Sequence, residues 1–510
     1  MLIKLLETAI DLQQAGRLDD AEKLYLQVLS KEPNNHFANH LLGVIQHQRG
    51  RNDEAIVLIA KAVQANPADA ETHKNLGNAQ RAAGMLDDAR QSYLKALELK
   101  PDYAEACNNL GLALTEAGML PEAIEYCLRA TQINPEYADG FVSLGNAYRL
   151  SGNLEDSRQA LLTAFNINPN SPHANNSIGV LHKDMELHAD ALGFFRKAIL
   201  LDPGFAEAHM NLGMTLLMFG EMQEGWREFS WRSSRLSFPQ PEWDGAPLAG
   251  KTILLYAEQG LGDSIQFIRY VPMIKELGGH VVVECQGPLQ VLFSGIKEID
   301  TLIVQGAPRP DFDVHASLYD LPGIMGTSVD SVPVNIPYLT TDGLERPIKI
   351  EPHANLDIGI VWAGSPKNVN DRNRSCEISD FKKLVSTDDF RFHSLQVGPR
   401  SADLEEACLA DRVNDLGSYL SALPTPMNVL PTLVEQMDLV ISVDTSCAHL
   451  AGALGVPVWM PLSRIHDFRW MADITETPWY PGMRLYRQQS LGDWEGVLAT
   501  ISSELEMLKT

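Results

Sequence analysis

Polar side chains cluster where an apolar strand pattern ends, in residues 438–460. The run DLVISV is followed by Asp444, Thr445 and Ser446, and a short helical pattern then carries His449 one turn later. Hydroxyls and unpaired N–H groups at the start of a helix, together with the helix dipole, can hold a phosphate. His449 would lie on the same face, within reach of a phosphate or a sugar hydroxyl. The alternative is an ordinary helix N-cap with a satisfied histidine.

A second loop of this kind follows the apolar run TILLYA. Gly260 and Gly262 make a tight turn there, and Asp263 falls at the start of a predicted helix. A carboxylate in this position is most simply an N-cap, but in a loop facing a cleft it can act as a general base. Ile265 occupies the position where a dinucleotide fingerprint needs its third glycine, so the pattern excludes a nicotinamide cofactor site.

A third loop, after the run DIGIVW, concentrates positive charge. Lys367, Arg372 and Arg374 lie within eight residues of one another in a chain of net charge −25. Arginine binds phosphate through two donors and lysine as a point charge, so this cluster indicates an anion site. Salt bridges with Asp371 are the alternative.

The first half of the chain repeats with a period of 34 residues. A helix pair explains the pattern: glycine ends the first helix, small residues allow close packing, and proline stops the second helix. The repeated positions are Pro33, Pro67, Pro101, Pro135, Pro169 and Pro203, and Gly16, Gly50, Gly84, Gly118, Gly152 and Gly220, with Glu186 interrupting the glycine series.

Asparagines precede three of the Leu-Gly steps of this repeat, at Asn75, Asn109 and Asn211. An asparagine side chain can bind both the N–H and the C=O of an extended peptide. These residues therefore predict a groove for an acceptor peptide along the first helices of the repeats. They could also be solvated groove residues without a ligand.

The composition limits the classes of function. The net charge of −25 disfavours nucleic acid and anionic membranes as partners. Six cysteines without a C-x-x-C pair argue against disulfides and a structural zinc site, and no apolar run is long enough to span a membrane. The first residues, MLIKLLETAIDLQQAG, lack the continuous apolar run of a signal peptide, so we expect a cytoplasmic protein.

The elements that would position these residues form three domains. We expect a helical superhelix of about seven repeats over 2–236 and a proline-rich linker over 237–250. Short continuous apolar runs alternating with helical patterns then predict two α/β units with parallel strands, over 251–345 and 356–510. Parallel sheets bind ligands beyond the carboxyl ends of their strands, where the three loops lie.

The repeats resemble tetratricopeptide repeats. From about Gly225 onward the chain resembles a GT-B glycosyltransferase, close to the bacterial heptosyltransferases (glycosyltransferase family 9) and to bacterial glycosyltransferases that carry tetratricopeptide repeats. The segments that carry the resemblance are PEWDGAPLAGKTILLYAEQGLGDSIQFIRY, VWAGSPKNVNDRNRS, SVDTSCAHLAGALGVPVWMPL and WYPGMRLYRQ.

This resemblance implies a fold of two Rossmann-like domains facing a cleft, with the acceptor on the first and the donor on the second. It implies that Asp263 is the base and that one of the three basic residues contacts the donor. No cofactor and no metal ion are implied. The donor set that the resemblance adds is Asp444, Thr445 and His449, Ser446 in place of the family's glycine, and Gln396 near the nucleotide.

The activity implied is that of an inverting glycosyltransferase, which moves a sugar from a nucleotide-diphosphate sugar to a hydroxyl. The order of repeats and catalytic domains is similar to that of O-linked N-acetylglucosamine transferases, so the acceptor would be a protein recruited by the repeats. Two alternatives are a glycan or lipopolysaccharide-type acceptor, and a non-catalytic repeat scaffold with a vestigial GT-B module.

Overall fold

The computed structural model describes residues 2–508 except 259, 352–354, 367 and 369, so the predicted site residue Lys367 lies outside the described residues. It divides the chain into two compact units, Met1–Ala208 and His209–Thr510. This division falls before the predicted boundary at residue 236, because the last helical pair packs into the core of the second unit.

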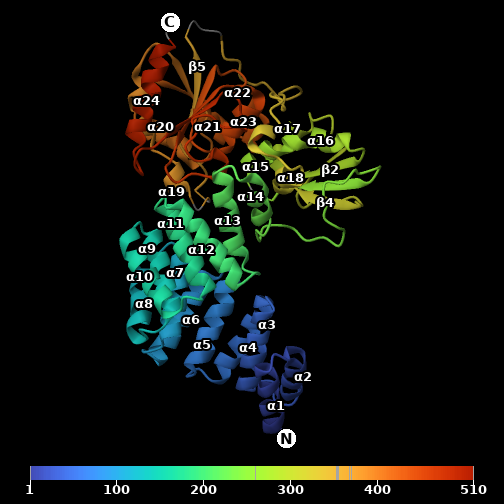
Figure 1. The fold of residues 1–510 in the computed structure, drawn as a ribbon, viewed down its shortest axis with the longest axis vertical. Coiled ribbons are helices and arrows are strands. Elements are labelled where there is room, and N and C mark those ends of the chain that lie inside the picture. Colours follow the sequence, from blue (N-terminus) through green and yellow to red (C-terminus); the bar gives the residue numbers. More distant parts are fainter. Residues whose placement is uncertain (1, 259, 352–354, 367, 369, 509–510) are drawn as a thin grey trace. The chain divides into compact units, whose positions relative to one another are not determined.

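The first unit consists of antiparallel helix pairs that follow one another along the chain (Figure 1). Consecutive helices are in contact, both within each pair and between neighbouring pairs. The helices are α1 (Leu2–Gln14), α2 (Leu18–Leu29), α3 (His36–Gln48), α4 (Asn52–Ala65), α5 (Ala70–Ala82), α6 (Leu86–Leu99), α7 (Ala104–Glu116), α8 (Leu120–Ile133), α9 (Ala138–Leu150), α10 (Leu154–Ile167), α11 (Pro172–Asp184) and α12 (His188–Leu201).

The glycines of the 34-residue pattern do what their spacing predicts. Gly50 and Gly84, just past the ends of α3 and α5, have φ angles of +75° and +77°, which favour glycine. Glu186, the one interruption, adopts φ +62° at the equivalent turn. The Leu-Gly glycines allow close helix packing, since a Cβ on Gly77 would lie 2.6 Å from the Tyr93 ring.

The second unit begins with the helix pair α13 (Ala206–Met218) and α14 (Met222–Phe229), followed by a four-stranded parallel sheet in the order β3-β2-β1-β4. Its described strands are β1 (Thr252–Tyr256), β2 (His280–Cys285), β3 (Thr301–Val304) and β4 (Val314–Ser317). The helices associated with it are α15 (Leu261–Phe267), α16 (Val271–Glu276), α17 (Gln290–Phe293) and α18 (Leu321–Ile324).

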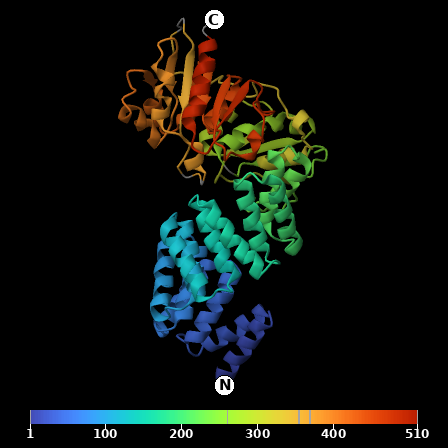
Figure 2. The same ribbon diagram turned by 60° about the vertical axis from the view of Figure 1, so that its left-hand side comes forward.

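A six-stranded parallel sheet follows, in the order β10-β9-β8-β5-β6-β7. The long helix α24 (Trp494–Met507) contacts β9 and β10 and lies along this sheet (Figures 1 and 2). The described strands are β5 (Asp357–Val361), β6 (Arg391–Ser394), β7 (Val413–Asp415), β8 (Leu439–Ser442), β9 (Val458–Leu462) and β10 (Met483–Arg487). Its other α-helices are α19 (Asp371–Arg374), α20 (Asp403–Glu406), α21 (Leu416–Ser421), α22 (Leu430–Val434) and α23 (Ser446–Leu454).

Seven of these parallel strands were correctly predicted from apolar runs, which are TILLYA, HVVVEC, DTLIV, DIGIVW, FRFHSL, DLVISV and PVWM. The strands β4, β7 and β10 were not predicted, because their sequences VHAS, VND and MRLYR are short or interrupted by polar residues. They are strands because a neighbouring strand supplies their hydrogen bonds, which a local pattern does not record.

One hydrophobic core joins α13 and α14 to both sheets of the second unit. Trp226 packs edge-on against Phe267 and Phe468, with ring centroids 6.0 and 5.7 Å away, and Phe229 lies 5.4 Å from Tyr319. In the described part of the chain, no helix has the length and apolar character needed to cross a membrane.

Candidate functional site

The loops singled out from the sequence follow central strands of the two sheets. β1 lies between β2 and β4, and β5 lies between β6 and β8. At β1 and at β5 the order of the strands reverses. Open parallel sheets bind ligands at the carboxyl ends of the strands at such a reversal. Asp263 follows β1, the basic loop follows β5, and Asp444 follows β8.

Asp263 lies in the first turn of α15 and is held by three groups. Its Oδ2 accepts the Gly260 N–H at 2.7 Å. Its Oδ1 accepts the Tyr319 hydroxyl at 3.1 Å and lies 2.6 Å from Nη2 of Arg469. The side chain keeps 15% of its surface exposed, so it is oriented without being fully enclosed.

Arg469 is the residue of this site that sequence reasoning missed. It belongs to a 3₁₀ turn, Phe468–Trp470, after β9, and its guanidinium contacts Asp263, the Tyr319 hydroxyl and Asp467. The side chain is 7% exposed, and its Nε has no hydrogen-bond partner among the described residues. The sequence feature that could have indicated Arg469 is the run HDFRW, which has two opposite charges in a loop after a strand.

Burial and charge act in opposite directions on Asp263. Burial raises the pKa of its carboxyl group, and the Arg469 guanidinium partly opposes that rise. A raised pKa makes the carboxylate a stronger proton acceptor, which suits a general base.

The loop after β8 is partly exposed where it starts α23. The Thr445 hydroxyl lies 3.0 Å from the Ser442 hydroxyl, and Asp444, Thr445 and Ser446 are each half-buried. Burial, followed by the negative charge of Asp467, raises the pKa of Asp444 to about 6. This loop therefore combines a helix N-terminus with a carboxyl group that titrates near neutral pH.

His449 is buried, with only 3% of its side chain exposed. Its Nδ1 lies 2.9 Å from the Tyr480 hydroxyl, and its ring centroid lies 5.2 Å from that of Trp470. Burial lowers the pKa of His449, and three arginines, Arg469, Arg269 and Arg374, lower it further. The imidazole is thus neutral and packed inside the site, and its bond to Tyr480 agrees with the alternative of a satisfied histidine.

The loop with Asp263 touches the helix that starts at Ser446. A Cβ atom on Gly262 would lie 2.8 Å from Cδ2 of His449 and 3.5 Å from Cα of Ser446. A side chain at this position would clash with the imidazole, and α15 and α23 are in contact. The structure therefore brings the predicted base and the predicted phosphate loop into one site.

The basic loop joins this site through Arg374. Its Nη1 donates to the Asp444 carbonyl at 3.1 Å, and its Nε donates to Asp371 at 3.3 Å. The guanidinium also lies over Gly364, where a Cβ would come within 2.4 Å of it. Arg372 is exposed. Arg374 thus reaches the loop that begins at Asp444. It also forms a salt bridge with Asp371, as the alternative interpretation predicted.

Every hydrogen-bonding position of the Gln396 side-chain amide has a partner within the chain. Its oxygen accepts the N–H groups of Trp362 and Ala363, at 3.1 and 2.9 Å. Its nitrogen donates to the carbonyls of Ala363 and Val397, at 3.0 and 3.1 Å. The side chain braces the exit of β5 and has no remaining hydrogen-bonding capacity for a nucleotide.

Two of the predicted groove asparagines hydrogen-bond to neighbouring repeats. Asn75 lies 2.8 Å from Nε2 of His40, and Asn109 donates to Asn78 at 2.9 Å. Asn211 lies on α13 in the second unit and is 6% exposed. In the first unit these amides connect neighbouring repeats.

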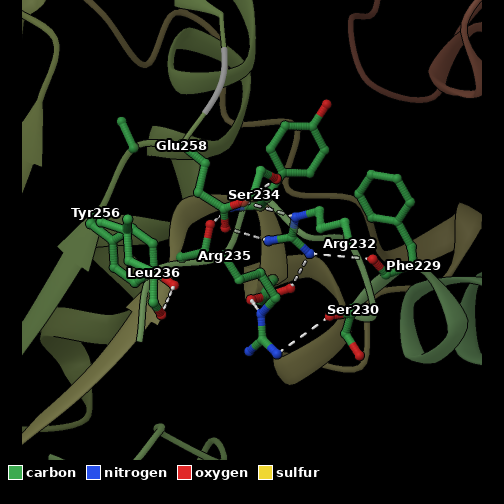
Figure 3. A network of polar contacts seen from close by, with 12 residues as sticks. Phe229, Ser230, Arg232, Ser234, Arg235, Leu236, Tyr256 and Glu258 are labelled. Carbon is green, nitrogen blue, oxygen red and sulfur yellow. Dashed lines mark hydrogen bonds and ion pairs between the residues drawn. The ribbon is translucent and has the colours of Figure 1, made fainter. Parts of the chain in front are cut away.

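A buried ion network connects the segment after α14 with Glu258, which follows β1 (Figure 3). Arg232 binds Glu258 through Nε and Nη2, at 3.0 and 2.5 Å, and binds Asp320 at 2.7 Å. Arg235 adds a contact of 3.1 Å to Asp320. Burial opposes the charge on Arg232, but Asp320 and Glu258 raise its pKa above the usual value. The network links the segment after α14 to Glu258, two residues before the Gly260 turn.

Comparisons with known proteins identify the repeats. Family models described as tetratricopeptide repeat or TPR repeat match residues 6–70, 77–118, 104–137 and 138–171. The N-terminal part of the chain therefore consists of tetratricopeptide repeats, as predicted.

A curated relative, Protein FlbA of Caulobacter vibrioides, is 26% identical over 329 residues, which are 57% of this chain and 53% of that protein. The chain thus spans about half the length of this relative. Among solved structures, MamA is 30% identical, with 32% of this chain and 97% of that chain covered and a TM-score of 0.28. A tetratricopeptide repeat protein of Parabacteroides merdae is 19% identical, with 45% and 91% covered and a TM-score of 0.40.

Proposed function

We propose that the chain is an inverting glycosyltransferase that moves a sugar from a nucleotide-diphosphate sugar to a hydroxyl group. The observation that carries the proposal is the contact between the two strand-exit loops, in which Gly262 lies against His449. It puts a carboxylate with a raised pKa beside a helix N-terminus, the pairing that proton removal and phosphate departure require.

In this mechanism Asp263 takes the proton of the acceptor hydroxyl. Its Oδ2 accepts the Gly260 N–H and offers a second lone pair, while Arg469 and Tyr319 hold Oδ1. The acceptor oxygen bonds to the anomeric carbon as the bond from that carbon to the diphosphate oxygen breaks. The electron pair leaves with the diphosphate, and the configuration inverts.

The departing diphosphate would be stabilised at the start of α23. The first N–H groups of the helix, the hydroxyls of Thr445 and Ser446 and the guanidinium of Arg374 all lie at this point. These groups can neutralise the developing charge without a metal ion. Lys367 stays a candidate for the same role.

The tetratricopeptide repeats support a protein as the acceptor, held by a groove of the first unit that includes Asn75 and Asn109. They also favour a second candidate function, a protein-interaction scaffold in which the α/β region has no activity. Nucleotide binding separates the two, because only the first requires it.

We expect one nucleoside diphosphate among UDP, GDP, ADP and CDP, or its sugar conjugate, to raise the unfolding temperature of the purified chain. The rise is measured against the same buffer without nucleotide, with and without EDTA. It should persist in EDTA and disappear in Thr445→Ala, which removes a hydroxyl from the proposed cradle. Absence of a shift with every nucleotide would favour the scaffold.

The affinity for the nucleotide sugar should depend on the protonation of Asp444. Because burial raises the pKa of this carboxyl group to about 6, it loses its negative charge as the pH falls from about 7 to about 5. Removing one negative charge beside a bound diphosphate contributes roughly 1 kcal/mol, or about five-fold in affinity. Calorimetric titration across this range should show tighter binding at lower pH, and Asp444→Asn should give a flat profile.

A further inference from the structure

Three side chains with metal-binding groups meet in the first unit, away from the site described above. His36 and His40 lie one turn apart on α3, and Asp69 is the N-cap of α5. One potential ligand atom from each lies within 4.8 Å of the others. None of these residues takes part in the proposed glycosyl transfer.

Hydrogen bonds already orient two of the three groups. Nδ1 of His36 lies 3.0 Å from the Ala62 carbonyl, and a carbonyl accepts only, so Nδ1 carries a proton. Nε2 of the same ring then points at Oδ2 of Asp69, 3.1 Å away. Asp69 is itself fixed by the Glu71 N–H and the Thr72 hydroxyl.

The contact between His36 and Asp69 needs a positive charge. A neutral imidazole with its proton on Nδ1 presents a lone pair at Nε2, and a carboxylate oxygen also presents a lone pair. The repulsion between these two lone pairs is removed either by a second proton on the ring or by a cation that both groups bind. A histidine held by a backbone carbonyl through Nδ1 is the usual arrangement of a metal ligand.

His40 adds the third ligand from the same face of α3. Histidines four residues apart on a helix face the same way, and the ring centroids of His36 and His40 are 6.0 Å apart. Nε2 of His40 lies 2.8 Å from the Asn75 amide. Rotation of that amide would free the nitrogen and offer the Asn75 oxygen, or a water molecule, as a fourth ligand.

We propose that His36, His40 and Asp69 form a binding site for a divalent transition metal ion such as Zn²⁺. Two imidazoles and one carboxylate suit zinc, which takes four nitrogen, oxygen or sulfur ligands. The ion would join α3 to the start of α5 and so fix the geometry of two neighbouring repeats, including Asn75. The cysteine pattern could not reveal this site, because it contains no cysteine.

The test uses the full chain without an affinity tag, stripped of metal by dialysis against a chelator. Zn²⁺ titrated by calorimetry should bind at one site per chain, and Co²⁺ should give a visible absorption band that Zn²⁺ abolishes. His40→Ala and Asp69→Asn should each weaken binding at least about ten-fold, the smallest cost typical for residues that support a metal site. Asn still caps a helix, so Asp69→Asn keeps α5 intact.

His47→Ala is the matched control. His47 lies on the same helix and binds Asn52 at 2.8 Å, outside the cluster, so this variant should bind Zn²⁺ like the wild type. Failure of the wild type to bind at one site, or equal affinity in all variants, would overturn the proposal and leave a protonated His36 as the partner of Asp69. Circular dichroism checks that each variant is folded.

Discussion

Replacing Asp263 by Asn is expected to lower kcat for glycosyl transfer by roughly 100- to 10,000-fold, the range that general base catalysis contributes. The amide oxygen can still accept from Tyr319 and Arg469, while the amide nitrogen can neither take a proton nor accept the Gly260 N–H. Steady-state kinetics with the nucleotide sugar identified by thermal shift provide the measurement. The nucleotide should bind Asp263→Asn with nearly unchanged affinity, because the proposed cradle lies on α23.

Asp311→Asn serves as the control for this change. Asp311 is exposed in the DFD segment, while Asp313 accepts the Thr252 N–H at 2.8 Å at the start of the first sheet. We expect Asp311→Asn to retain full activity, since this segment only resembles a metal-binding D-x-D. Normal turnover by Asp263→Asn would show that the base is a different group.

Replacing Arg232 by Met is expected to destabilise the second unit by about 3–5 kcal/mol, the usual cost of removing one partner from a buried ion pair. Glu258 has no exposed side-chain surface and Asp320 only 9%, so both carboxylates would lose a buried counter-charge. Denaturant unfolding followed by tryptophan fluorescence measures the loss, because Trp226, Trp470 and Trp479 are buried in this unit.

Arg235→Met provides the comparison. Arg235 is 26% exposed, and Asp320 would keep its contact with Arg232, so we expect a loss of about 1 kcal/mol or less. Adding Glu258→Leu to Arg232→Met should recover part of the lost stability, since it removes a carboxylate left without its cation. Equal losses in the two single variants would mean that the network contributes no more than a surface ion pair.

The repeats could be predicted closely because their signals are local. A glycine with φ near +75° must stand within a few residues of each helix end, and a proline marks the end of the second helix. Continuous apolar runs likewise predicted the strands buried on both faces. The same reasoning missed MRLYR, whose arginines interrupt the pattern in a strand that pairs along β9.

The candidate site was only partly predictable, because some of its contacts depend on residues far apart in the sequence. Asp263, Asp444 and Arg374 stood out because each follows an apolar strand, and parallel strands carry their exits to one edge of a sheet. The sequence position of Gln396 was compatible with a contact to the nucleotide. Its hydrogen bonds to the backbone at the end of β5 form only because β5 and β6 pair.

Sequence alone determined the repeats, the parallel strands with continuous apolar runs and the loops with polar side chains, because each depends on residues close together in the chain. Tertiary structure alone decided that Arg469 meets Asp263, that Arg232 meets Glu258, and that His36 meets Asp69. Each pair joins residues far apart in the sequence, and the free energy of such contacts depends on burial and distance, which spacing along the chain does not encode.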